Sequence, residues 1–96
     1  MAEVQTTTSQ GEMTLRFIEF VRMHSHNASL FLGKVPHPQT GQPQVNLDVA
    51  RMLVEQLAAI QLKTRGNLNP DEESVINTAL ANLQADYARA LEARRS

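Results

Sequence analysis

The sequence predicts a small all-α protein in which three helices form one domain that is completed by homo-oligomerisation. Apolar residues recur at helical spacing in three segments, at about 12–32, 47–65 and 70–93. Residues that typically begin or end helices lie at the borders of these segments. With only 96 residues in total, three such helices bury a thin core.

The composition limits the classes of function that the chain can have. Hydrophobic residues make up 42% of the chain, which is enough to fold. Nine Lys and Arg against ten Asp and Glu leave no positive excess for nucleic acid. No cysteine is present, which excludes disulfides and favours a reducing compartment, so we expect a cytoplasmic protein. No signal peptide or long apolar run occurs, and no membrane association is predicted.

The first helix has more apolar surface than one copy is expected to cover. A polar stretch without periodicity precedes it, so we expect residues 1–11 to be a disordered tail and 12–96 to be the helical domain. The apolar stripe comprises Met13, Phe17, Phe20, Val21, His24, Ala28, Phe31 and Leu32. Met23 and Leu30 widen this stripe, so we predict a homodimer. The candidate self-association residues are Phe17, Phe20, Val21, His24 and Phe31.

A proline-rich arm at residues 34–45 follows Gly33, which is placed to cap the first helix. Its three prolines favour extended backbone, and Gly41 suits a turn, so we expect an extended arm with a turn. Two interpretations stay open. The arm covers the edge of the core, or it presents a pre-ordered surface to another protein. The candidate partner-binding residues are Pro36, His37, Pro38, Thr40, Gly41 and Pro43.

The second and third helices are predicted to form an antiparallel hairpin, because only a short link around Gly66 separates them. Asn46 is the expected cap of the second helix. Asn69, Pro70 and Glu72 predict the start of the third helix, since they supply a cap, a first-position proline and a capping box. The core stripes of these two helices include Leu47, Ala50, Leu53, Val54, Leu57, Ile60, Ile76, Leu80, Leu83 and Tyr87.

The stretch from Leu32 to Ala50 resembles the hallmark of a bacterial family catalogued as domain of unknown function eighteen-forty-four. The resemblance extends back to Phe17 and forward through residues 63–73 into the third helix. Members of that family are short proteins, predicted to be helical, with no assigned activity. The resemblance therefore implies a bacterial source and transfers no catalytic or binding residue.

Groups that suggest chemistry have simpler structural explanations. His24 and His26 lie about 200° apart around a helix, so they cannot share one metal ion. The acidic run Asp71 to Glu73 suits the positive end of the third helix. The chain carries no catalytic triad, phosphate loop or nucleotide-binding motif. We therefore predict no enzymatic activity, no cofactor and no metal site.

Our leading functional hypothesis is a non-catalytic protein-protein interaction or scaffolding module of the bacterial cytosol, with an unidentified protein partner. Two alternatives stay open. The helix ends that carry Arg89, Arg94 and Arg95 suit a small nucleic-acid-binding regulatory protein, which the net charge disfavours. The Met- and Phe-bearing face of the first helix suits a carrier of apolar ligands.

Overall fold

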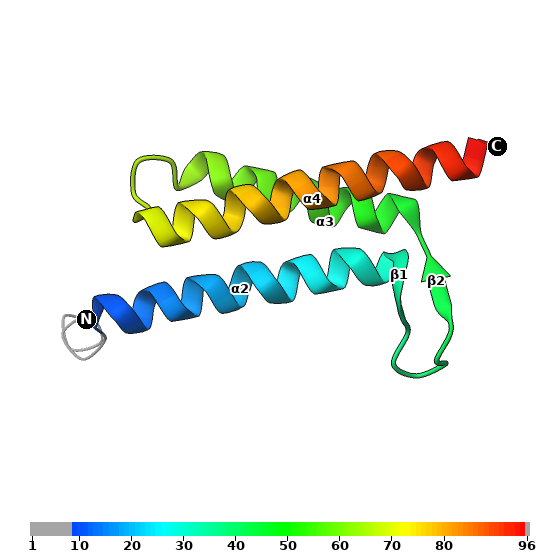
Figure 1. The fold of residues 1–96 in the computed structure, drawn as a ribbon, viewed down its shortest axis with the longest axis horizontal. Helices are drawn as coiled ribbons and strands as arrows, with labels where there is room; N and C mark the ends of the chain where they lie inside the picture. The colour runs from blue at the N-terminus through cyan, green and yellow to red at the C-terminus, as the bar shows by residue number, and fades with distance from the viewer. Residues whose placement is uncertain (1–8, 96) are drawn as a thin grey trace.

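The computed structural model describes residues 9–95, which form three helices and one β-hairpin (Figure 1). Helix α2 spans Gln10–Phe31, α3 spans Leu47–Lys63 and α4 spans Pro70–Arg95. Strand β1 spans Leu32–Pro36 and strand β2 spans Pro43–Val45. Helices α2 and α4 run in the same direction and α3 runs against both (Figure 1). Each helix packs against the other two, which confirms the small all-helical fold.

Helix α2 begins two residues before the predicted start at residue 12, because Ser9 and Glu12 form a capping box. The Ser9 hydroxyl accepts from the Glu12 backbone N–H at 3.1 Å, and the Glu12 carboxylate accepts from the Ser9 N–H at 3.0 Å. Of the predicted disordered tail, residues 1–8 lie outside the described part of the chain. Residues 9–11 form the cap and first turn of the helix and do not belong to a tail.

The other helix borders follow local hydrogen bonds. Asn46 caps α3 as predicted, since its side chain accepts from the Val49 N–H at 3.2 Å. Helix α3 ends at Lys63, before the predicted residue 65, where the Thr64 hydroxyl donates to the Ile60 carbonyl at 2.7 Å. Helix α4 begins at the predicted residue and continues to Arg95, two residues beyond the predicted end.

The core lies along the common axis of the three helices and is entirely apolar among the described residues. It consists of Val21, Ala28, Leu32, Leu47, Ala50, Val54, Leu57, Ile76, Leu80 and Leu83. The predicted stripes of α3 and α4 supply most of these residues. The stripe of α2 is wider than the surface that its neighbours cover, and Met13 and Phe20 remain 57% and 42% exposed.

The predicted extended arm is a two-stranded antiparallel hairpin that projects past α2 at one end of the bundle (Figure 1). Leu32 pairs with Val45, and Pro36 pairs with Pro43, with an irregular register between them. Gly33 adopts φ +79°, and a Cβ at this position would lie 2.8 Å from Cγ2 of Val45. A glycine is therefore needed where the chain passes from α2 into the hairpin.

Candidate functional site

The base of the hairpin is fixed to two helices. The Asn46 N–H donates to the Phe31 carbonyl at 2.8 Å, which joins the beginning and the end of the hairpin. The Lys34 ammonium lies 3.3 Å from a carboxylate oxygen of Asp86 on α4. Asp86 also pairs with Arg89, and its side chain is only 12% exposed. These contacts set the direction in which the hairpin leaves the bundle.

The tip of the hairpin is closed by hydrogen bonds between its own residues. The His37 N–H donates to the Gln42 carbonyl at 2.9 Å, and the Gly41 N–H donates to the His37 carbonyl at 2.7 Å. The Gln39 N–H donates to the His37 ring Nδ1 at 3.1 Å, and the Gln42 N–H donates to the Thr40 hydroxyl at 3.3 Å. Gly41 has φ +71°, which suits this turn. The tip has a defined shape before any partner binds.

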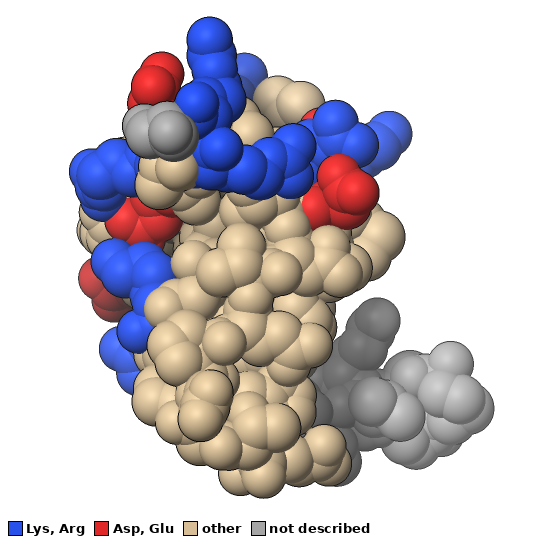
Figure 2. Space-filling view, turned by 90° about the vertical axis from the view of Figure 1, so that its right-hand side faces the viewer, with Lys and Arg blue, Asp and Glu red and all other residues tan. Residues whose placement is uncertain are grey.

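All six candidate partner-binding residues lie on this hairpin. Residues 38–46 are exposed, and His37 is half-buried. Between Val35 and Leu47 the chain contains no Lys, Arg, Asp or Glu. Figure 2 shows the end of the molecule that carries the hairpin, with the uncharged surface below and the charged side chains gathered above it. The hairpin therefore presents prolines and neutral hydrogen-bonding groups.

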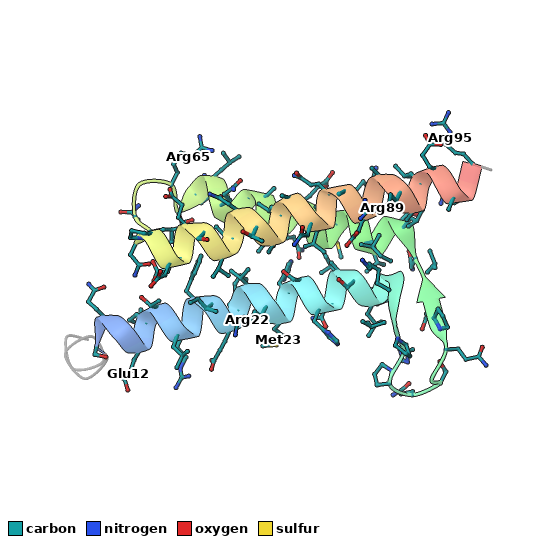
Figure 3. All side chains as sticks on the ribbon, viewed as in Figure 1. Glu12, Arg22, Met23, Arg65, Arg89 and Arg95 are labelled. Carbon is teal, nitrogen blue, oxygen red and sulfur yellow. The ribbon has the colours of Figure 1, made fainter. Side chains whose placement is uncertain are left out.

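The basic surface above the hairpin comes mainly from the C-terminal part of α4 (Figures 2 and 3). Arg89 is held by the carboxylate of Asp86, and Arg95 lies 4.0 Å from Glu92. Figure 3 places Arg89 and Arg95 at the hairpin end of α4, and Arg65 at the opposite end of the molecule. Nearby carboxylates therefore offset part of the positive charge that suggested nucleic acid.

A second exposed surface lies along the seam between α2 and α3. The His24 ring Nε2 lies 2.9 Å from the Leu53 carbonyl, so this part of α2 faces α3. The Phe20 ring stacks on His24 with 5.6 Å between ring centroids. We call the outer side of this seam the α2/α3 face. By helical geometry it comprises Met13, Arg16, Phe20, Met23 and Asn27 of α2, and Val49, Met52, Leu53, Gln56 and Lys63 of α3.

The predicted self-association residues differ in what they offer to a second copy. Val21 is fully buried inside its own bundle, so it is not available to another copy. Phe17 and Phe31 are half-buried against the core. Phe20 is 42% exposed and Met23 is 63% exposed, with Met23 on the side of α2 away from α4 (Figure 3). Met52, which the sequence alone did not single out, is 48% exposed and lies opposite the core stripe of α3.

Polar groups that suggested chemistry form structural contacts. The Thr14 hydroxyl donates to the Glu72 carboxylate at 2.9 Å and accepts from the Asn69 side-chain amide at 2.9 Å. Asn69 and Glu72 also form the capping box of α4, with bonds of 2.8 and 3.0 Å. Among residues 9–95, no three His, Asp or Glu side chains gather closely enough to hold a metal ion. The acidic start of α4 therefore joins it to α2.

Two hollows on the surface are open and largely polar. One lies between α3 and α4 and is lined by Gln61, Arg65, Leu68, Glu73, Ile76 and Asn77. The other lies between α2 and α4, beside the ion pair of Lys34 and Asp86, with Ser25, Ser29 and Asn82 on its walls. Neither has the apolar, enclosed lining that a lipid-like ligand requires. None of the helices described between residues 9 and 95 is long and apolar enough to cross a membrane.

Comparison with known proteins agrees with the resemblance seen in the sequence. No curated protein and no solved structure matches the chain. The family described as Domain of unknown function (DUF1844) matches residues 14–89, from the first turns of α2 to the last part of α4. The match includes the hairpin and most of all three helices. The chain therefore belongs to the DUF1844 family.

Proposed function

We propose that this chain is a non-catalytic interaction module that contacts a protein partner through the tip of its β-hairpin. The observation that carries the proposal is the combination of exposure and order in residues 37–42. The tip lies at the outer end of the hairpin, yet its backbone is held by four internal hydrogen bonds. A segment that is ordered before binding loses less conformational entropy when it meets its partner.

The chemistry of the tip fits a protein better than a nucleic acid. Phosphate backbones attract Lys and Arg, and none occurs between Val35 and Leu47. Prolines and exposed neutral amides suit a groove lined by aromatic or polar side chains of another protein. The absence of cysteine from the sequence fits a reducing compartment, so we place the module in the bacterial cytosol as part of the same proposal.

The test is affinity purification of the tagged chain from the organism that encodes it, followed by mass spectrometry. Two variants alter the hairpin. One replaces Pro36, Pro38 and Pro43 with Ala, and the other replaces residues 37–42 with a two-residue Asn-Gly turn. The matched control is Pro70→Ala, which removes a proline from the first position of α4 and leaves the hairpin intact.

We expect the wild type and the Pro70→Ala variant to capture the same protein, and both hairpin variants to lose it while keeping their helical circular dichroism. Capture of that protein by the shortened-hairpin variant would overturn the proposal. Retention of nucleic acid that falls steeply with salt would instead favour the alternative function at the Arg-bearing helix ends. Lipid that co-purifies with the chain would favour the other alternative, a carrier of apolar ligands.

A further inference from the structure

We propose that the α2/α3 face binds the same face of a second copy, with the two molecules antiparallel about a two-fold axis that crosses the middle of α2. This inference concerns a surface separate from the hairpin tip and does not depend on the proposed function. The other helices bury one side of α2 and leave another side exposed. Ala28 is fully buried on one side, whereas Met23 is 63% exposed on another.

The face combines exposed apolar side chains with two uncharged polar side chains, Asn27 and Gln56. Phe20, Met23 and Met52 expose between 42% and 63% of their surfaces, and half-buried Val49 and Leu53 lie between them. Helical geometry places two charged side chains on this face, Arg16 and Lys63, and both lie at the end farther from the hairpin. Exposed Met and Phe side chains beside one another are typical of surfaces that another molecule covers.

The size of the face is sufficient for a small dimer. The 17 residues of α3 extend for roughly 25 Å, and two packed helices are about 20 Å wide. Two copies that cover the whole face would therefore bury about 1,000 Å² in total, which is the lower limit for specific interfaces. In an interface of this size, a few residues near the centre carry most of the binding energy.

Charge decides the relative orientation of the two copies. In a parallel arrangement, α2 of one copy would lie over α3 of the other. Arg16 and Lys63 of both copies would then meet at one end. In the antiparallel arrangement α2 lies over α2, so these cations are separated by the length of the face. Arg16 already lies 3.2 Å from the Glu19 carboxylate in its own copy. Lys63 is therefore the cation on this face for which the other copy should supply a carboxylate.

The contact between His24 and Leu53 sets which level of α2 lies beside which level of α3. That contact places residues 21 and 22, next to the centre of α2, beside residues 55 and 56 of α3. A two-fold axis at this level pairs Phe20 of one copy with Met23 of the other. It also brings Lys63 of one copy to Asp48 of the other, at the rim of the interface. Apolar side chains of α2 meet near the axis, and opposite charges meet at the edge.

The whole molecule shows the same complementarity. The half that holds the hairpin, residues 22–55 and 79–95, contains six Lys and Arg and four Asp and Glu, a net charge of +2. The other described half, residues 9–21 and 56–78, contains three Lys and Arg and five Asp and Glu, a net charge of −2. Antiparallel copies place unlike halves side by side. At physiological salt this attraction acts over only about 8 Å, so contacts at the rim dominate.

The first experiment measures mass by sedimentation equilibrium for the wild type, Met23→Glu and Leu62→Glu. Both substituted side chains are similarly exposed, at 63% and 61%, so neither change disturbs the core. Leu62 is the control because it lies away from the α2/α3 face. We expect a wild-type dimer, an unchanged Leu62→Glu dimer, and at least about tenfold weaker association of Met23→Glu. A monomeric wild type, or equal effects of the two variants, would refute the proposal.

The second experiment tests the orientation with single cysteines, since the wild type contains none. Mixing Arg16→Cys with Asn27→Cys should give a mixed disulfide, because the two-fold axis places these positions together. The background rate of disulfide formation is measured by mixing Asn27→Cys with Ser74→Cys. Ser74 is an exposed residue of α4, outside the α2/α3 face. If Arg16→Cys instead reacts preferentially with Lys63→Cys of another molecule, the copies are parallel and the antiparallel register is wrong.

Discussion

At the scale of single residues, several polar side chains of this chain join one helix to another. Thr14 illustrates this, because its hydroxyl bonds both members of the capping box of α4. One threonine near the start of α2 thus fixes the start of α4, 55 residues later. The capping residues Asn69 and Glu72 could be predicted from the sequence, because helix caps have local sequence patterns. The contact of this cap with Thr14 could not be predicted, because it depends on how the helices pack.

Thr14→Val keeps the shape of the side chain and removes both hydrogen bonds. We expect it to lower the free energy of unfolding by about 1–2 kcal/mol, because the Glu72 carboxylate and the Asn69 amide lose a partner in a partly buried position. Urea unfolding measures the loss. Thr78→Val is the control, since Thr78 is exposed on α4. Equal losses in the two variants would show that the link contributes nothing.

Gly33 is the residue on which the junction between α2 and the hairpin depends. Gly33→Ala introduces a Cβ at positive φ and 2.8 Å from a Val45 methyl group. Gly66→Ala also introduces a Cβ at positive φ, but with open space around it. The first variant should lose roughly 1 kcal/mol more stability than the second, because it carries the clash as well as the backbone strain. Equal thermal midpoints for the two variants would contradict the close approach.

At the scale of elements, the sequence predicted the three helices well because each has a clear apolar period. Their ends were less certain. Ser9 and Glu12 have the spacing of a capping box, but the polar stretch around them favoured a tail, and the start of α2 was placed too late. The end of α3 was also placed too late, because a threonine hydroxyl bonds a carbonyl of the last turn and the helix ends before Gly66. Local signals of one or two residues decide such borders.

The hairpin was predicted only in part. Three prolines in residues 34–45 correctly indicated extended backbone and a turn. The strands themselves were not predicted, because proline lacks the N–H that strand pairing uses and the segment has no alternating pattern. Pairing of Leu32 with Val45 is set at the base, where α2 and α3 bring the two ends together. Only the packed helices determine that contact.

The hairpin should be as rigid as the helices if its tip is ordered before binding. We expect backbone ¹⁵N order parameters of about 0.8 for Gln39, Gly41 and Gln42, because their N–H groups donate to atoms within the tip. Asn67, in the turn between α3 and α4, is the internal reference. Order parameters below about 0.6 at the tip would show a flexible loop and remove the basis for pre-ordered binding.

At the scale of the whole molecule, a thin core and an elongated shape are the features that led us to propose a second copy. The chain extends over 53 × 30 × 20 Å, and its radius of gyration of 15.6 Å exceeds the roughly 12.5 Å of a compact domain of this length. Of residues 9–95, ten are buried, and several large apolar residues of α2 are not. The sequence indicated this excess, but Val21 and Phe20 could not be told apart until the neighbouring helices were placed.

Stability measured at different protein concentrations tests directly whether one copy is incomplete. Urea unfolding of the wild type at about 1 µM and at about 100 µM should give a higher midpoint at the higher concentration, because a dimer that binds only folded chains stabilises them by mass action. Met23→Glu should show little or no such rise. If the wild-type midpoint is the same at both concentrations, a single copy is complete and the association proposed for the α2/α3 face is wrong.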